Sequence, residues 1–414
     1  MTLTVRTERI TEARPLLDVA LDLPDVHRAV FVRDGEGFVA AGEAMTLSVP
    51  VGEGRTRIAR ERLTALFADA DIDDAVHIPG SGAVAIASFT FDPAADGSVL
   101  RVPRVLVGRR DGVTWRTTID PDGQPPLVAP EAPRPRAGSD DVDRPRYGGS
   151  TVADAAWLEA VVDTVDAIRA GRFAKAVLAR DVHLWSRTPF AMDEVLAALS
   201  ARFPSCFTFL VDGLVGASPE LLLRRRGPTV ASRVLAGTAP RGDDPTEDAK
   251  FGDALLASTK DRWEHDLAAR SVTDVLDRYC TVVDAPEGPS LVRLDNVQHL
   301  GSDVTGMLAG DVHVLDLLDA LHPTAAVAGT PRDVALAHIR DVEGMDRGRY
   351  AGPVGWCDVD GDGEFAIALR CAEVDGARAR LFAGAGIVEG SLPEAELMET
   401  WLKMRAMTGV LAAG

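Results

Sequence analysis

Short Asp-Gly turns between apolar segments are the feature that most limits how this chain can fold. Asp212-Gly213 divides the apolar run in residues 206–227, and Asp/Gly-rich turns divide residues 350–388 into three expected strands. Asp-Gly between two such runs is typical of a two-residue hairpin turn, which joins antiparallel neighbours. Parallel strands would need a crossover of a dozen or more residues. The sequence therefore predicts an α+β fold of large antiparallel sheets with inserted helices, rather than repeated β–α–β units.

Three segments have helical periodicity. Residues 151–171 place apolar side chains at helical spacing, with Ser150 or Thr151 expected to cap the start and Gly171 the end. Single helices are also expected over 246–280 and 393–413. Further strands are expected within 75–91 and 99–108, and the Pro- and Gly-rich residues 129–150 are expected to form a linker or a long loop.

Charge and composition exclude several classes of protein. The 414 residues carry a net charge of −19, which argues against binding nucleic acid or an anionic membrane surface, since both need a positive face. A small anionic substrate remains possible, because a site can be locally positive. The first residues lack the apolar core of a signal peptide, no apolar run is long enough to span a membrane, and the four cysteines form no C-x-x-C pair. A cytoplasmic protein with reduced thiols is expected, with a monomer as the default.

Two segments far apart in the sequence each carry an acidic pair at i, i+3 spacing. Asp261 and Glu264 lie in the segment "STKDRWEHD", and Glu396 and Glu399 lie near the C-terminus. Residues three apart share one face of a helix. Four converging carboxylates would repel one another unless a cation neutralised them, and all-oxygen ligands favour Mg²⁺. The alternative is two solvated helix faces with incidental acids.

Three charged residues stand where apolar ones would be expected in strands. Lys175 interrupts "FAKAVLAR", Glu220 lies in "ASPELLL", and Arg370 lies in "AIALRCAEV". A charge on the inner face of a strand is costly unless it is paired or serves a ligand, whereas a charge on the outer face has no such meaning. The segment "DVDGDG" (358–363) begins like a calcium loop but lacks its final glutamate, so a hairpin turn is predicted.

Ordered motifs across residues 150–410 together resemble the chorismate-utilising enzymes, which include anthranilate, aminodeoxychorismate, isochorismate and salicylate synthases. The motifs are "FAKAVLAR", "GASPELLLRR", "VLAGTAPRG", "LLASTKDRWEHDLAARSV", "NVQHLGSDVTGML", "LHPTAAVAGTP", "RGRYAGPVGW", "ALRCAEV", "LFAGAGIVEGS" and "EAELMETWLKM". The resemblance implies one domain over residues 1–414, of the anthranilate synthase component I-like fold. Residues 1–130 would be its variable N-terminal part, and residues 151–410 would carry the catalytic motifs.

The resemblance also implies a site for chorismate and Mg²⁺. It implies that Glu264 and Glu399 are metal ligands and that Asp261 and Glu396 hold metal-bound water. It implies that Arg370, with Tyr350 nearby, clamps the enolpyruvyl carboxylate, for which a guanidinium fork is suited. The other substrate-binding positions implied are the backbone of "AGAG" at Gly384 and Gly386, together with Gly237, Thr238, His299, Ala326, Val327, Leu369 and Lys403. His322 is expected to be structural.

Within this family, lysine at 175 and alanine at 236 match the members that add water at C2 of chorismate. The resemblance implies that Lys175 is the general base for water and that Glu220 is the general acid for the departing C4 hydroxyl. A carboxyl group can play that part only if burial or nearby carboxylates keep it protonated. The expected activity is that of an isochorismate synthase, an isomerase, which serves menaquinone or catechol siderophore synthesis.

Other functions remain open. A salicylate synthase would share the first step and then eliminate pyruvate, but such enzymes tend to carry a hydroxyl residue at the position of Ala326. An ammonia-using anthranilate synthase is disfavoured by Lys175, so no glutaminase subunit is expected. A catalytically inactive scaffold protein is disfavoured because Lys175, Glu220, Glu264 and Arg370 are all present together with Glu399.

Overall fold

The larger of two sheets runs through most of the protein. The computed structural model describes residues 2–124, 127 and 144–412, and within them thirteen strands form this sheet. In spatial order it contains β10 (Arg146–Tyr147), β11 (Lys175–Trp185), β23 (Arg378–Ile387), β22 (Cys371–Asp375), β13 (Leu214–Ser218), β12 (Phe207–Val211), β2 (Ala29–Arg33), β3 (Glu36–Ala41), β8 (Val105–Arg110), β9 (Val113–Pro121), β1 (Leu3–Arg9) and β5 (Asp71–Asp74), while β19 (Gly329–Thr330) also pairs with β11. All pairings are antiparallel except β1 with β5 at one edge.

The smaller sheet has ten strands in the described part of the chain. In spatial order it contains β16 (Cys280–Asp284), β18 (Val297–Leu308), β15 (Thr229–Pro240), β14 (Leu221–Arg226), β21 (Gly363–Ile367), β20 (Pro353–Asp358), β6 (Val84–Ser88), β7 (Val99–Val102) and β4 (Met45–Thr46), and β17 (Ser290–Arg293) also pairs with β18. Strands from the N-terminal part join both sheets, since β2 pairs with β12 and β6 pairs with β20. The prediction of a single α+β domain with mainly antiparallel sheets is confirmed.

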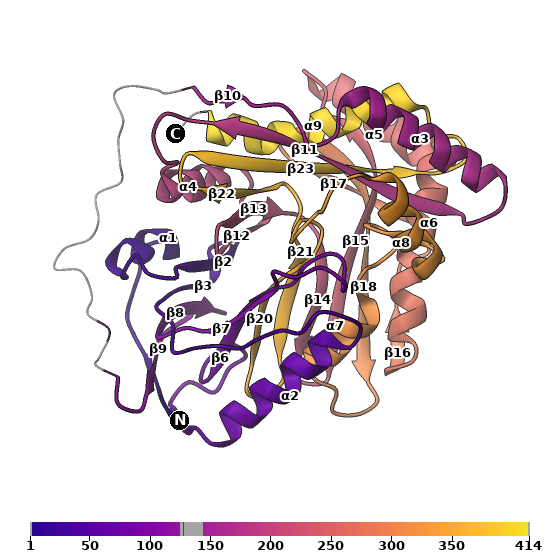
Figure 1. The fold of residues 1–414 in the computed structure, drawn as a ribbon. Coiled ribbons are helices and arrows are strands. Elements are labelled where there is room, and N and C mark those ends of the chain that lie inside the picture. Colours follow the sequence, from indigo (N-terminus) through magenta and orange to yellow (C-terminus); the bar gives the residue numbers. More distant parts are fainter. Residues whose placement is uncertain (1, 125–126, 128–143, 413–414) are drawn as a thin grey trace.

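Helices pack against both sheets (Figure 1). They are α1 (Leu16–Val19), α2 (Arg55–Ala68), α3 (Asp154–Arg169), α4 (Met192–Arg202), α5 (Pro245–Ala257), α6 (Thr259–Leu276), α7 (Val314–Leu321), α8 (Arg332–Val342) and α9 (Pro393–Leu411), with a 3₁₀ turn at Ala20–Asp22. α9 packs on β23, and α6 packs on β15 and β18. None of the described helices is both long enough and apolar enough to cross a membrane.

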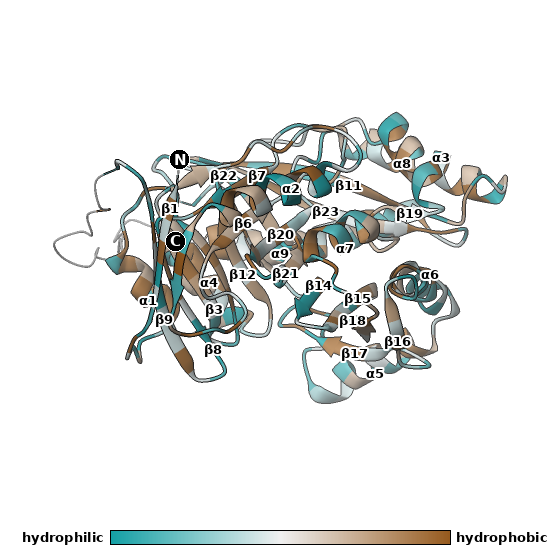
Figure 2. Ribbon diagram, turned by 90° about the horizontal axis from the view of Figure 1, so that it is seen from below, coloured by the Kyte–Doolittle hydropathy of each residue, from teal (hydrophilic) through white to brown (hydrophobic). Residues whose placement is uncertain are grey.

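The strands of the larger sheet present apolar side chains on both faces. In β2, Phe31 belongs to the core between the two sheets, while Val30 and Val32 belong to the core under α1, α4 and α9. Successive side chains of a strand point to opposite faces, so such a strand reads as a continuous apolar run. In the smaller sheet, too, the strands β6 and β20 are coloured as largely apolar in Figure 2, whereas α6 is largely hydrophilic. Burial on both faces explains why these runs do not alternate with polar residues.

The hairpin at Asp212-Gly213 forms as predicted. β12 and β13 pair on either side of it, and the two turn residues have φ values of +49° and +81°. Both values lie in the left-handed region that a type I′ turn requires. The "DVDGDG" segment is likewise a hairpin turn, between β20 and β21, as predicted.

Two helix predictions were wrong in detail. Residues 246–280 form two helices rather than one, because Ser258 ends α5 and its Oγ accepts a hydrogen bond from Asp261 N (3.2 Å) as the cap of α6. The N-cap of α3 is Ala153 without a side-chain cap, because Thr151 binds Asp181 instead. Gly171, with a φ of +73°, does follow the end of α3.

The strand count in residues 350–388 was also wrong, since four strands form there and not three. The run "AIALRCAEV" reads as one strand, but β21 ends at Ile367 and β22 begins at Cys371. Arg370 between them has a φ of +48°, outside the extended region. The expected strand in 75–91 is confined to β6, and residues 99–108 divide into β7 and the start of β8. Residues 129–143, which are most of the expected linker (129–150), lie outside the described residues.

Candidate active site

The candidate site lies where two segments pass from one sheet to the other. Pro219 and Glu220 connect β13 of the larger sheet to β14 of the smaller one, and residues 368–370 connect β21 back to β22. Ser218 Oγ donates to Ile367 O (2.5 Å), and Ile367 N donates to Glu220 O (3.2 Å). These bonds hold the two crossing segments together, so Glu220 and Arg370 face the same space.

A cavity with an empty volume of about 630 Å³, part of it open solvent, occupies this junction. Fourteen of the residues predicted for the site line it: Glu220, Gly237, Thr238, Glu264, His299, Ala326, Val327, Tyr350, Leu369, Arg370, Gly384, Gly386, Glu399 and Lys403. They come from both sheets, from α6 and from α9.

Arg370 and His299 form a buried polar pair in the cavity wall. Arg370 Nη2 lies 2.9 Å from His299 Nε2, and His299 Nδ1 lies 3.2 Å from Gly237 O and 3.1 Å from Thr238 Oγ1. Burial, together with the nearby charges of Arg370 and Lys403, holds the pKa of His299 well below its usual range. The neutral ring then donates from Nδ1 to the carbonyl and accepts from Arg370 at Nε2. Arg370 Nε has no partner in the described part of the chain, so the guanidinium retains a donor for a ligand.

Tyr350 lies beside the glycine-rich part of β23. Its ring stacks on Phe382, with centroids 5.1 Å apart, and burial raises the pKa of its hydroxyl. A Cβ atom added at Gly384 would lie 3.2 Å from the Tyr350 hydroxyl oxygen. The absence of side chains at this edge of β23 therefore leaves room for an anion near the tyrosine hydroxyl.

Lys175 is fully buried at the start of β11 and reaches toward the carboxylate of Glu264 on α6. Its Nζ lies 3.1 Å from Glu264 Oε1 but without hydrogen-bond alignment, so it has no hydrogen-bond partner among the described residues. Buried polar groups nearly always have partners. An unpartnered buried amine next to a cavity indicates a position for water or a ligand.

The surroundings of Glu220 favour the protonated, uncharged form of its carboxyl group. Burial raises its pKa to about 8, although the charges of Lys175, Arg370 and Lys403 oppose this. A carboxyl group with such a pKa is protonated at neutral pH and can donate a proton. Strongly shifted carboxyl groups in a cavity are typical of functional sites.

The four predicted metal-binding acids form a cluster between α6 and α9, but they do not all reach the cavity. Glu264 and Glu399 line it, whereas Asp261 contacts Ser258 and Glu396 lies 2.6 Å from Lys260 Nζ. Burial raises the pKa of both Asp261 and Glu396, and the charge of Glu399 raises each further. No group of three or more His, Cys, Asp or Glu side chains within residues 2–124, 127 and 144–412 is arranged as a metal site.

The residues present nevertheless fit Mg²⁺. Glu264 and Glu399 supply carboxylates to one cavity from two different helices, and the charge of Glu399 adds to burial in raising the pKa of both Asp261 and Glu396. Mg²⁺ is commonly bound by one or two carboxylates and completes its shell with water and substrate oxygens. A two-carboxylate site with an adjacent ligand cavity meets that requirement.

Lys403 is in contact with Glu399, one of the two predicted metal-binding acids that line the cavity. Its Nζ lies 2.5 Å from Glu399 Oε1 and donates to Gly384 O (2.9 Å). The lysine therefore links α9 to β23 at the edge of the cavity and adds a positive charge there. His322, which was expected to be structural, is buried outside the cavity and donates from Nε2 to Ala351 O (3.1 Å).

Several cavity residues were missed at the sequence level. Arg347, Val177, Pro219, Leu235 and Ala351 also line the cavity, and Ala236 lies there as well. Arg347 stands three residues before Tyr350 in "RGRYAGPVGW", but its spacing gives no signal of its own. The other missed residues are apolar and resemble ordinary core positions.

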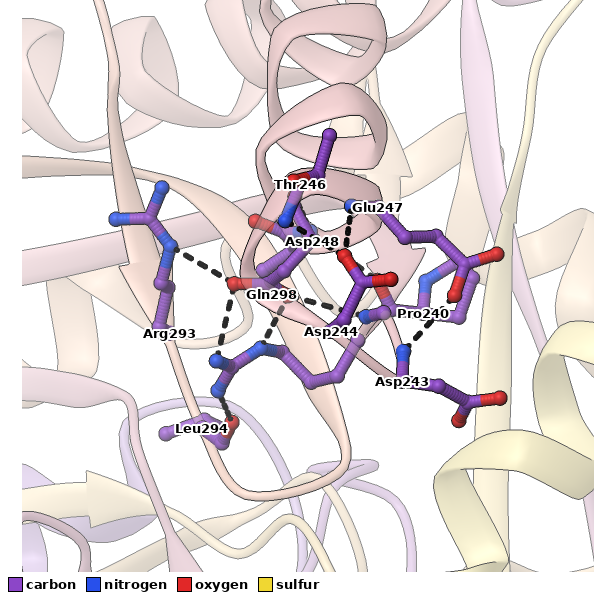
Figure 3. Close-up of polar contacts among 11 residues, drawn as sticks. Pro240, Asp243, Asp244, Thr246, Glu247, Asp248, Arg293, Leu294 and Gln298 are labelled. Atoms are coloured by element: carbon purple, nitrogen blue, oxygen red, sulfur yellow. Dashed lines mark hydrogen bonds and ion pairs between the residues drawn. The ribbon is translucent and has the colours of Figure 1, made fainter.

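A polar network at the start of α5 fixes the end of the β15–β18 pair that carries Gly237, Thr238 and His299 (Figure 3). Gln298, fully buried, donates from Nε2 to Pro240 O (3.1 Å) and Asp248 O (3.2 Å). Asp248 binds Arg241 through both oxygens, at 2.6 and 3.0 Å. These bonds anchor the strand ends next to the cavity wall.

Gly386 provides a direct test of the Lys175–Glu264 arrangement. A Cβ atom there would lie 1.9 Å from Glu264 Oε1 and 3.1 Å from Lys175 Cε. Both are ends of flexible side chains, so Gly386→Ala should fold but displace both side chains from their present positions. We expect kcat for the proposed reaction to fall by about tenfold or more, with little change in melting temperature.

The control for this variant is Gly390→Ala, where an added Cβ meets no atom within 4 Å. It should retain full turnover. Equal activities of Gly386→Ala and Gly390→Ala would show that the close approach over Gly386 is unimportant.

The chain is similar in sequence to known proteins. Residues 26–412 match the family model described as "Chorismate binding enzyme". An isochorismate synthase from Bacillus subtilis, DhbC, is 44% identical over 57% of this chain and 63% of its own length. The salicylate biosynthesis isochorismate synthase from Pseudomonas aeruginosa is 44% identical over 62% of this chain and 55% of its own length. The matches thus span less than two thirds of these relatives.

Similarity to solved structures extends over nearly the whole chain. A putative 2,3-dihydroxybenzoate-specific isochorismate synthase from Bacillus anthracis superposes with a TM-score of 0.80 and 30% identity, covering 96% of this chain and all of that one. The similarity therefore extends over both sheets and includes the N-terminal strands.

Proposed function

The chain belongs to the chorismate-binding enzyme family, and we propose that it acts as an isochorismate synthase, converting chorismate to isochorismate. The observation that carries this proposal combines two groups: the buried Lys175 amine, which has no hydrogen-bond partner among the described residues and lies 3.1 Å from the cavity-lining carboxylate of Glu264, and the cavity-lining carboxyl group of Glu220, whose pKa is raised to about 8. The relatives named as isochorismate synthases support it.

In the proposed reaction, Lys175 accepts a proton from a water molecule as the water oxygen bonds to C2 of the substrate ring. The ring double bonds shift, and the bond from C4 to its hydroxyl breaks. Glu220 gives its proton to the departing oxygen, which leaves as water. One water enters and one leaves, so the product is an isomer of the substrate. Each proton transfer of this kind contributes about 10²- to 10⁴-fold to the rate.

The other cavity residues orient the substrate. Arg370, with its unpartnered Nε, is placed to hold the enolpyruvyl carboxylate, and Tyr350 lies near the open edge of β23. Glu264 and Glu399 would hold Mg²⁺, with Asp261 and Glu396 around them. When bound, Mg²⁺ neutralises the ring carboxylate of the substrate. The apolar Ala326 and Val327 offer no hydroxyl to the cavity, which favours isochorismate over salicylate as the final product.

The test is to incubate the purified protein with chorismate and Mg²⁺ and to resolve the products by chromatography, with and without ammonium. Isochorismate without pyruvate and without an ammonium requirement is the expected result. Salicylate and pyruvate in equal amounts would identify a salicylate synthase, and anthranilate formed only with ammonium would identify an anthranilate synthase.

Glu264→Gln tests the proposed metal site. Because the amide is a weaker ligand than the carboxylate, we expect the Mg²⁺ concentration for half-maximal activity to rise at least tenfold. Direct titration with Mn²⁺ as a paramagnetic probe should show weaker binding as well. Glu394→Gln, on an exposed position of α9, should leave both titrations unchanged. Unaltered Mn²⁺ binding by Glu264→Gln would remove that residue from the metal site.

A further inference from the structure

A second pair of buried charges, Arg347 and Glu343, lies at the wall of the cavity, which Arg347 lines, and the proposed reaction does not use it. Arg347 and Glu343 are each 3% exposed, and two hydrogen bonds of 2.6 Å join the guanidinium to the two carboxylate oxygens. Glu343 caps the C-terminal end of α8, and Arg347 precedes the turn that carries Tyr350. The pair therefore starts from a helix end and a loop, outside both sheets.

The remaining polar atoms of this pair bind the backbone of two cavity walls. Arg347 Nη2 donates to Val177 O (2.6 Å), and Glu343 Oε2 accepts from Ala179 N (2.8 Å). The pair is therefore hydrogen-bonded to the backbone of β11 at two residues shortly after Lys175. Arg347 Nη1 donates to Val327 O (2.9 Å), on the loop that places Ala326 and Val327 in the cavity. One guanidinium thus bonds both to the strand that begins with Lys175 and to the apolar wall.

Two further contacts hold Arg347. The central carbon of its guanidinium lies 4.0 Å from the centroid of the Phe91 ring, and its backbone oxygen accepts a hydrogen bond from Tyr350 N (3.0 Å). The strand and the loop are also joined directly, since Val177 N donates to Ala328 O (2.7 Å). Together these bonds set the position of Lys175 relative to Val327 and Tyr350.

Stability alone is a weak reason for such a pair. Burying two charges costs free energy that their attraction repays only partly, and well-packed apolar residues are often as stable. A lysine at position 347 would keep the charge but could not present the planar fork that reaches two carbonyls and a carboxylate at once. The geometry thus favours a positioning role over a purely stabilising one.

We propose that Arg347 and Glu343 are positioning residues, which hold the strand of Lys175 and the wall of Ala326 and Val327 in fixed register across the cavity. The expected effect on turnover rests on the proposed function, whereas the fixed position of the strand relative to the cavity wall does not. Small displacements of catalytic groups can lower rates by up to about 10²-fold.

The test compares Arg347→Lys with Arg225→Lys. Arg225 is a matched control, because it is also buried and bonded to a carboxylate and a carbonyl (Asp311 and Asp360) but does not line the cavity. For Arg347→Lys we expect kcat to fall about 10- to 100-fold, with a smaller change in KM. Hydrogen–deuterium exchange should accelerate in residues 175–179 and 324–328 and stay unchanged in the rest of the larger sheet. Arg225→Lys should show neither effect.

Either the kinetic measurement or the exchange measurement can overturn the inference. Unchanged exchange in both segments, or equal acceleration throughout the protein, would show that the pair does not set this register. Accelerated exchange with wild-type kcat would show that the register does not matter for turnover. If the wild-type protein makes no isochorismate, the proposed function fails, and the exchange experiment still supports or overturns the register. Should Arg347→Lys fail to fold, Glu343→Gln, which removes only the charge, is measured in the same way.

Discussion

Replacing Lys175 with alanine is expected to lower kcat by about 10²- to 10⁴-fold, the range for loss of a general base. Lys175 is fully buried, and its amine has no hydrogen-bond partner among the described residues, although it lies 3.1 Å from the carboxylate of Glu264. Its loss should spare binding of chorismate in the presence of Mg²⁺, since the proposed carboxylate contacts come from Arg370 and the metal site. Steady-state kinetics together with equilibrium binding separates these two effects.

Two further variants test whether a loss of turnover comes from the missing amine or from misfolding. Lys175→Met fills the same space without an amine and should be as inactive as the alanine variant, with a melting temperature close to that of the wild type. Lys250→Ala, at an exposed position of α5, should be fully active. Turnover at the wild-type rate in Lys175→Met would exclude Lys175 as the base.

Replacing Glu220 with glutamine should have the second-largest effect on turnover, again about 10²- to 10⁴-fold, because the amide cannot donate the proton to the departing oxygen. In the wild-type protein, burial raises the pKa of Glu220 to about 8. The acid form is the active one, so kcat/KM should fall about tenfold per pH unit above pH 8. A flat rate profile up to pH 10 would contradict the role of Glu220 as acid.

The same substitution should make the protein more stable at alkaline pH. The folded pKa of Glu220 lies above its ordinary value of 4.5, so between pH 4.5 and about 8 the folded state keeps a proton that the unfolded state has released. The free energy of unfolding therefore falls as pH rises through this window, by at most about 1.4 kcal/mol per pH unit from this group. Glutamine does not ionise, so Glu220→Gln should melt several degrees higher than the wild type at pH 8.5, with the gap closing toward pH 5.

Asp358→Asn serves as the control, because it removes another buried carboxyl group of raised pKa at a position outside the cavity. Burial raises the pKa of Asp358 to about 7, but the residue lies at the end of β20, away from the cavity. Its replacement should leave kcat unchanged. Equal melting temperatures of wild type and Glu220→Gln from pH 5 to 9 would show that Glu220 does not carry a raised pKa in the folded protein.

The sequence predicted those parts of the fold and site that depend on local chemistry. The Asp212-Gly213 turn follows from the φ values that Asp and Gly tolerate. Lys175, Glu220 and Arg370 could be predicted as candidate site residues because a charge in an apolar strand is costly, and all three are buried in the structure. Their roles, by contrast, were implied only by resemblance to a family and remain proposals.

Features that depend on the tertiary arrangement could not be predicted. Apolar residues continue through Ala368 and Leu369, so nothing in the sequence marks the crossing between sheets that places Arg370 in the cavity. Ser258 divides α5 from α6 through a cap that competes with helix continuation, and serine alone is a weak signal for such a break. Arg347 is revealed only by its contacts with segments distant in sequence.

The most direct measurement of the central claim is to run the reaction in water enriched in ¹⁸O and to determine the mass of the product. If water attacks C2 and the C4 hydroxyl departs, isochorismate formed from unlabelled chorismate must carry one ¹⁸O atom and be heavier by two mass units. Lys175→Met should form almost none of this product. Isochorismate without the label would contradict the account, because its hydroxyl would then come from the substrate and not from a water molecule activated by Lys175.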